Sequence, residues 1–226
     1  IGVFRTEDGA SWTSFNIGLP NAFVAALALD ARSGTLTAGT YGRSVYQINL
    51  KPPQTGPNLL ASGVVNAANY QPLVAPGSIA TLFGTRLASA PAAAAGRPLP
   101  TTLGGAAVTV NGLPAPLFFV SPGQINFQFP FEVSGSQAVV VITTAEGSAS
   151  ALVQVLPSAP GLFEGTVIHG ASGAAVEAAN PAVPGEVLVL FATGLGVTNP
   201  AVASGAASPA SPPAAAAIGV TASLGG

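Results

Sequence analysis

The sequence predicts an all-β protein with two successive sandwich-type domains after a short N-terminal β segment. The 28 Gly and 21 Pro residues divide the 226-residue chain into short runs rich in Val, Thr and Phe. Strands joined by tight turns give this pattern, because Gly and Pro destabilise the interior of long helices. A repeated strand-and-turn unit and runs that alternate apolar with polar residues favour the same fold class.

The composition excludes several classes of partner and site. Only 6% of the residues are charged, the net charge is -2, and Lys and Arg together number six. Without a basic surface to neutralise phosphates, we expect no nucleic acid partner. Gly and Pro interrupt every apolar run before it reaches the roughly 20 residues that a membrane-spanning helix needs. The absence of Cys excludes disulfides and thiolate metal sites.

Residues 1–50 are expected to form about four strands. Short apolar runs at Ala26–Leu29, Thr35–Ala38 and Arg43–Ile48 are separated by turn residues such as Asp30–Gly34. About four strands in fifty residues is the size of one propeller blade, and one blade alone cannot bury both faces of its sheet.

The eight residues that begin at Arg5 resemble the Asp-box of sialidase-like propellers, whose pattern is Ser-x-Asp-x-Gly-x-Thr-Trp. Gly9, Ser11 and Trp12 match or nearly match this pattern, whereas Arg5 stands at the Ser position and Glu7 at the Asp position. The resemblance implies that residues 1–50 are the last blade of a β-propeller. In those families the box is a fold-stabilising hairpin away from the catalytic centre, so it implies nothing about catalysis.

A domain boundary is predicted at Lys51–Asn58, a linker that contains three Pro and one Gly and has no periodicity. Beyond it, the segment Pro76–Leu87 returns as Pro184–Leu195, 108 residues later. Each copy has a Pro-Gly turn before an apolar run that ends in Phe. The flanks agree as well, since Ala68-Asn69 and Ala179-Asn180 both precede the Pro-Gly.

Residues 59–157 are predicted to form a seven-strand immunoglobulin-like sandwich. Asn111-Gly112 is a strong hairpin signal, and Ile125–Phe129 alternates apolar with polar residues as a half-buried strand does. Residues 158–226 are predicted to form a second sandwich that is incomplete, because Ile218–Gly226 corresponds only to the Val108–Gly112 part of the first. Such a half-domain leaves an apolar face and an unpaired strand edge, which predicts a protein partner or self-association there.

Residues 57–226 resemble the Solibacter-type C-terminal domain of secreted acidobacterial proteins. The resemblance implies immunoglobulin-like sandwiches of the transcription-factor type, attached to varied exported proteins that include propellers, and it implies no known activity. The truncated second copy departs from the family's full length. The motifs that carry the resemblance are Val64–Tyr70, Ala75–Ile79, Leu103–Gly105, Val108–Gly112, Val120–Pro130, Pro184–Val187 and Ala192–Gly196.

No catalytic, cofactor-binding or metal-binding residue is expected. His169 is the only histidine, lies in a turn-like run, and has no Cys or carboxylate pair at a metal-like spacing, so we interpret it as a loop histidine. A hydroxyl nucleophile needs a base, and no Gly-x-Ser-x-Gly motif provides the usual elbow. The acids are too scattered to predict a glycosidase pair: Glu7, Asp8, Asp30, Glu132, Glu146, Glu164, Glu177 and Glu186.

Three further groups receive structural interpretations. Gly104-Gly105 and Gly225-Gly226 lack the following Lys or helix of a phosphate loop, so we expect turns. Gln124 and Asn126 lie two residues apart on one face and are expected to bond a neighbouring turn rather than a ligand. Core packing is favoured over a sugar-binding face for the aromatic residues Tyr70, Phe118, Phe119, Phe127, Phe129 and Phe131.

The sequence therefore favours a non-catalytic structural or adhesive module that spaces, anchors or assembles an extracellular protein, with strand complementation into a filament as one route. The low charge and the abundance of Ala, Ser, Thr and Pro favour a secreted or cell-surface location. One alternative is the accessory C-terminal region of a secreted propeller glycoside hydrolase. Another is a carbohydrate-binding module, which makes a polysaccharide a second type of partner.

Overall fold

The computed structural model describes residues 2–6, 8–50 and 55–223, and every regular element in these ranges is a β-strand. The all-β prediction is confirmed. No helix in the described ranges is long and apolar enough to cross a membrane. The chain divides into two compact units, residues 1–54 and 55–226. Residues 51–54 of the predicted linker lie outside the described ranges.

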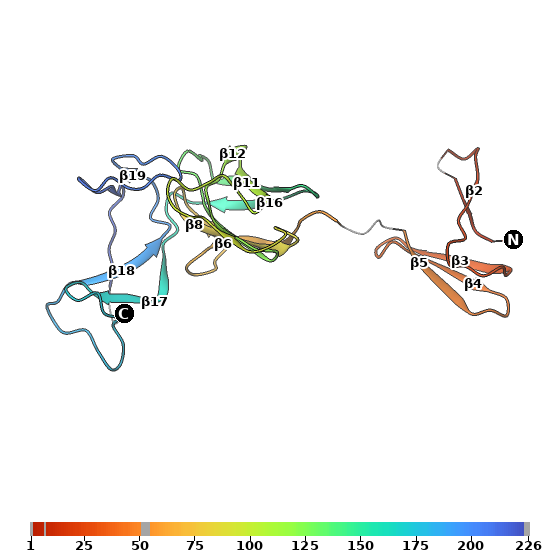
Figure 1. Ribbon diagram of the computed structural model, residues 1–226, viewed down its shortest axis with the longest axis horizontal. Coiled ribbons are helices and arrows are strands. Elements are labelled where there is room, and N and C mark those ends of the chain that lie inside the picture. The colour runs from red at the N-terminus through yellow and green to blue at the C-terminus, as the bar shows by residue number, and fades with distance from the viewer. Residues whose placement is uncertain (1, 7, 51–54, 224–226) are drawn as a thin grey trace. The chain divides into compact units, whose positions relative to one another are not determined.

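The first unit contains a three-stranded antiparallel meander and a separate pair of two-residue strands (Figure 1). The meander consists of β3 (Val24–Asp30), β4 (Thr35–Thr40) and β5 (Val45–Asn49), and the pair consists of β1 (Phe4–Arg5) and β2 (Thr13–Ser14). Among the described residues of this unit no sheet has four strands, and Gly18, with a φ angle of 74°, and Pro20 lie in the turn region between β2 and β3. Large apolar side chains of the meander, such as Leu27 and Leu29, remain exposed.

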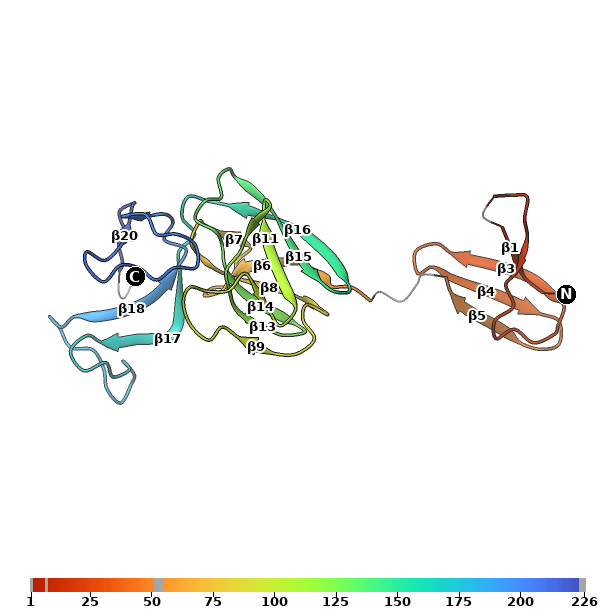
Figure 2. The same cartoon turned by 45° about the horizontal axis from the view of Figure 1, so that its top comes forward.

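The second unit begins with a sandwich of two sheets (Figures 1 and 2). One sheet contains, in spatial order, β6 (Asn58–Asn66), β8 (Ile79–Thr85), β14 (Gln124–Gln128), β13 (Leu117–Val120) and β9 (Ala92–Ala93). The other contains β10 (Thr102–Leu103), β11 (Ala106–Val110), β15 (Gln137–Thr144), β16 (Gly147–Val155) and β7 (Leu73–Val74), with β12 (Leu113–Pro114) beside β11. Seven of these strands have four or more residues, and the other four have two.

The core of the sandwich is formed by the inward-facing side chains of both sheets. On β14, Ile125 and Phe127 are fully buried, whereas the residues between and beside them are only half-buried, as the alternating sequence predicts. The predicted turn at Asn111 and Gly112 joins β11 to β12, and both residues have the positive φ angles that a tight hairpin turn requires.

Residues 158–223 belong to the same compact unit as the sandwich but contain little regular structure. β17 (Gly161–His169) pairs with β18 (Leu188–Thr193), and β19 (Thr198–Asn199) pairs with β20 (Ala215–Ala216). The predicted incomplete second sandwich therefore appears as one two-stranded sheet, one short strand pair and irregular chain.

A matched pair of leucine substitutions tests the position of the core. Leu82 on β8 is fully buried, whereas Leu152 on β16 is 64% exposed. We expect Leu82→Ala to lower the free energy of unfolding by about 2–5 kcal/mol and Leu152→Ala to change it by about 0.5 kcal/mol or less. Chemical denaturation of both variants measures the difference, and equal effects would contradict this packing of the two sheets.

Candidate functional site

The internal repeat is visible in the backbone pairing, where the β17–β18 pair reproduces the β6–β8 pair. Both pairs are antiparallel and contain an irregularity of the same size at the same place. Within that irregularity, Ser62 and Gly165 both have positive φ angles, 55° and 68°. The equivalent partners are Asn58↔Thr85 and Gly161↔Thr193, Leu59↔Gly84 and Leu162↔Ala192, Val64↔Leu82 and Val167↔Leu190, and Asn66↔Ala80 and His169↔Leu188.

This register makes His169 the structural equivalent of Asn66, and the turns that follow them are also alike. The Asn66 carbonyl accepts a bond from the Tyr70 amide, and the His169 carbonyl accepts one from the Gly173 amide, at 2.9 and 2.8 Å. The backbone amide of Asn66 donates to the Gln71 carbonyl, and the backbone amide of His169 donates to the Ala174 carbonyl. The expected turn position of His169 is corrected, because His169 is the last residue of β17 and its backbone pairs with Leu188.

The flanking part of the sequence repeat requires a different alignment. The side chain of Asn69 accepts a bond from the Gln71 amide, and the side chain of Ser172 accepts one from the Ala174 amide. Asn69 is therefore equivalent to Ser172 and not to Asn180. Ile79 lies 13 positions after Asn66, whereas its equivalent Val187 lies 18 positions after His169. The second copy is therefore five residues longer between its strands.

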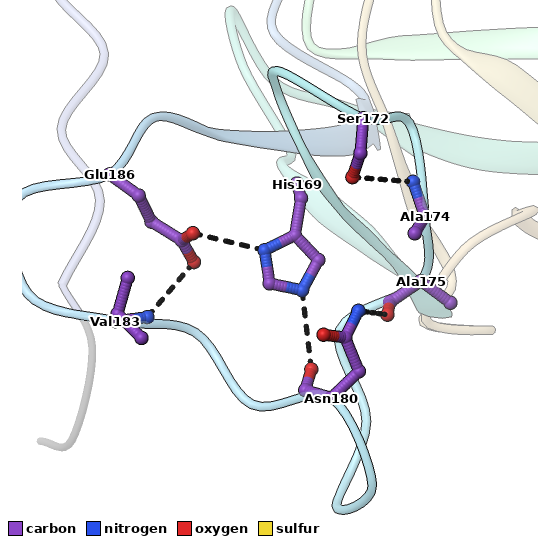
Figure 3. A network of polar contacts seen from close by, with 7 residues as sticks. All are labelled: His169, Ser172, Ala174, Ala175, Asn180, Val183 and Glu186. Atoms are coloured by element: carbon purple, nitrogen blue, oxygen red, sulfur yellow. Dashed lines mark hydrogen bonds and ion pairs between the residues drawn. The ribbon is translucent and has the colours of Figure 1, made fainter.

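Figure 3 shows the polar network around the His169 ring, to which the lengthened loop contributes Asn180. Nδ1 lies 3.0 Å from Oε2 of Glu186, and Nε2 lies 3.2 Å from the carbonyl oxygen of Asn180. The other carboxylate oxygen of Glu186 accepts a bond from the Val183 amide at 3.1 Å. His169 itself is 9% exposed. The imidazole thus connects the end of β17 to the loop that leads into β18.

The electrostatics of this network favour a charged pair. The hydrogen bond to Glu186 raises the pKa of His169 above its ordinary value of 6.5, and the Asn180 carbonyl raises it further. The same bond from His169 lowers the pKa of Glu186 below its ordinary value of 4.5. Together, His169, Glu186 and Asn180 can hold the loop between β17 and β18 in place. No cluster of three or more metal-ligating side chains occurs in the described part of the chain.

Two of the other acidic candidates, Asp8 and Asp30, hold local turns, and a third, Glu132, links distant parts of the chain. The Asp8 carboxylate accepts bonds from the Ala10 and Ser11 amides at 2.9 and 2.8 Å, which lowers the pKa of Asp8 to about 2. Asp8, and not the residue aligned with the Asp-box aspartate, therefore holds this turn, while Glu7 lies outside the described residues. Asp30 accepts bonds from the turn after β3, and Glu132 bonds Ser204.

The side chains of Gln124 and Asn126 bond each other rather than the backbone of a turn. The side-chain amide of Gln124 (Nε2) donates to Oδ1 of Asn126 at 2.8 Å, and the Thr81 hydroxyl on β8 donates to the same oxygen at 3.1 Å. Their common face is confirmed, but their contact with a neighbouring turn is corrected, because Ser121 bonds the backbone of that turn instead.

The remaining candidates are distributed between core and surface. Phe127 and Phe129 are fully buried, as core packing predicts, whereas Tyr70 is 61% exposed and lies 6.2 Å from the Phe83 ring. Phe118, Phe119 and Phe131 are half-buried. Gly104-Gly105 forms the expected turn between β10 and β11, and Gly225-Gly226 lies outside the described residues.

A second feature is the edge of β18 that faces away from β17. Its equivalent, β8, pairs on both sides, with β6 and β14, whereas β18 has β17 as its single neighbour in the described ranges. Val187, just before β18, and Val189 and Phe191, within it, are 74%, 39% and 49% exposed. Sequence reasoning predicts such an edge but misses the His169–Glu186 pair.

Comparisons with known proteins found no family model, curated protein or solved structure that matches this chain.

NMR titration tests the His169–Glu186 pair. We expect a His169 pKa above 6.5 in the native chain, with Glu186→Gln lowering it because the carboxylate is removed. As a control, Glu164→Gln changes an exposed carboxylate five residues earlier on β17 and should leave the His169 pKa unchanged. A His169 pKa at or below 6.5 in the native chain would contradict the pair.

The same shifts give the sign of the pH dependence. The His169 contribution to stability is complete below pH 6.5 and is lost as the pH rises through its raised pKa. The Glu186 contribution is complete above pH 4.5 and is lost as the pH falls through its lowered pKa. Amide exchange in the loop between β17 and β18, corrected for its intrinsic pH dependence, should therefore be slowest between pH 4.5 and pH 6.5, where both contributions are complete.

Proposed function

We propose that this chain is a non-catalytic structural module of an exported protein, in which a β-strand from a partner chain completes the second repeat. The observation that carries the proposal is the open edge of β18, a strand whose equivalent in the first sandwich is paired on both sides. Unpaired edges of this kind accept an added strand through their free amide and carbonyl groups.

The side chains beside this edge support an apolar partner strand. In the first sandwich, β8 pairs with β14 and the opposite sheet lies over its inner face, so Ala80 and Leu82 are fully buried in the core. Their equivalents, Leu188 and Leu190, are only half-buried. A strand that pairs with β18 as β14 pairs with β8 brings its own apolar side chains beside Leu188 and Leu190 and removes part of this surface from water, at about 25 cal/mol per Å².

A second candidate function concerns the first unit. The exposed Trp12, Phe23 and Leu29, at 63%, 67% and 60%, favour a sheet that neighbouring propeller blades cover. On this proposal the chain is the accessory C-terminal region of a propeller glycoside hydrolase. Sequencing the full gene tests it, because catalytic carboxylates in upstream blades would support it and their absence would exclude it. Binding of a glycan array to the intact chain tests the carbohydrate-binding alternative.

Strand completion is tested by supplying a strand. We expect a copy of the segment Gln124–Phe129, fused after Gly226 through a flexible Gly/Ser linker, to slow amide exchange in β18 at least tenfold, because paired amides exchange slowly. A fused control with Ile125→Asp and Phe127→Asp in the added copy should leave exchange unchanged. If the native and control fusions behave alike, the edge does not accept a strand and the proposal is wrong.

A further inference from the structure

The junction between the sandwich and the β17–β18 pair is built around Asn66. The Asn66 side-chain amide donates to the Ala159 carbonyl at 2.8 Å, and the Asn69 side-chain amide donates to the next carbonyl, that of Pro160, at 3.3 Å. Asn66 is fully buried. The segment Ser158–Gly161, here named the entry segment, therefore docks on the turn that follows β6.

The entry segment approaches this turn so closely that a side chain at Gly161 would require its neighbours to shift. A Cβ atom at Gly161 would lie 2.9–3.1 Å from atoms of Asn66, Ala68 and Asn69. Docking therefore favours glycine at this position, and a branched side chain such as Val would displace Asn66 and Asn69 from their bonds to the entry segment.

In the second repeat, His169 occupies the position of Asn66, and its ring also contacts a backbone carbonyl. That carbonyl belongs to Asn180, in the loop Ala175–Val183, here named the lid loop. The first repeat has only the short segment 72–75 at this place, and two of its residues form β7 in the opposite sheet. The five additional residues of the second repeat thus bring a carbonyl to the end of β17.

The attachment of the lid loop also follows the repeat. Ser78 follows the first Pro-Gly turn, and its hydroxyl accepts a bond from the Ala75 amide at 3.3 Å. Glu186 is its equivalent, and its carboxylate accepts a bond from the Val183 amide while also contacting His169. Replacement of Asn and Ser by His and Glu therefore adds an ion pair that ties the lid loop to β17.

We infer that the end of β17 around His169 is a docking site for the entry segment of a following sandwich repeat, and that the lid loop occupies this site as an internal substitute. While the lid loop is seated, no following repeat can join the second in the way that the second joins the first. This inference concerns the end of β17 and does not depend on strand addition at β18.

The experiment opens the site and offers it an entry segment. In the opened variant, Pro-Leu-Val from positions 72–74 replaces residues 175–182, and His169→Asn and Glu186→Ser restore the first-repeat residues. The probe is a copy of the segment Leu156–Phe163, fused after Gly226 through a flexible Gly/Ser linker that raises its effective concentration to the millimolar range.

We expect amides of the probe to exchange at least tenfold more slowly in the opened variant than in the native chain with the same fusion. The matched control carries Val in place of the glycine that corresponds to Gly161 and should show no protection. Equal exchange in the opened and native chains, or equal protection of the Gly and Val probes, would overturn the inference.

A milder variant keeps the inference testable if the opened variant does not fold. His169→Ala leaves the length of the lid loop unchanged and removes both contacts of the ring. We expect exchange in residues 175–183 to become at least tenfold faster, while exchange in β15 and β16 stays unchanged. Unchanged exchange in the lid loop would show that His169 does not hold it, which would also overturn the inference.

Discussion

The antiparallel pairing of a bulged strand with the strand after a Pro-Gly turn is the interaction on which the remainder of the second unit depends. It occurs as β6–β8 in the sandwich and again as β17–β18. In each case a residue with positive φ lies within the bulge, and the strand ends in a turn with the same two backbone bonds. The register therefore fixes which side chain stands at the end of the strand, Asn66 in one pair and His169 in the other.

Those parts of the fold that rest on local backbone requirements are predictable from the sequence. Gly77 and Gly185 have φ angles of 77° and 85° in the two Pro-Gly turns, and a residue with a Cβ is disfavoured there. The following strands, β8 and β18, begin two or three residues after these glycines. Alternation of apolar and polar residues along β14 likewise predicts that one face of this strand is buried, and Ile125 and Phe127 lie in the core.

The candidate site is not predictable in the same way, because its equivalences are three-dimensional. β6 and β17 share few identical residues, and Ser62 corresponds to Gly165 only because both adopt a positive φ angle. The Ala-Asn pairs at 68–69 and 179–180 are alike in sequence but not in position, because Asn69 lies three positions after Asn66 and Asn180 lies eleven after His169. His169 and Glu186 are 17 residues apart, and their contact arises from the pairing of β17 with β18, which no spacing rule for metal or catalytic residues describes.

The two repeats differ in how much they can stabilise themselves. The sandwich has a core of fully buried side chains drawn from both of its sheets. A two-stranded sheet alone is marginally stable in water, so the second repeat, which contains β17 and β18, depends on its bonds to the sandwich. The Ile79 amide donates to the Thr193 hydroxyl at 2.6 Å, the Asn66 side-chain amide to the Ala159 carbonyl, and the Gly205 amide to Oε1 of Gln128 at 2.6 Å. The residues of β6, β8 and β14 that bond the second repeat are held in place by the core of the first. The second repeat is therefore ordered by its contacts with the sandwich.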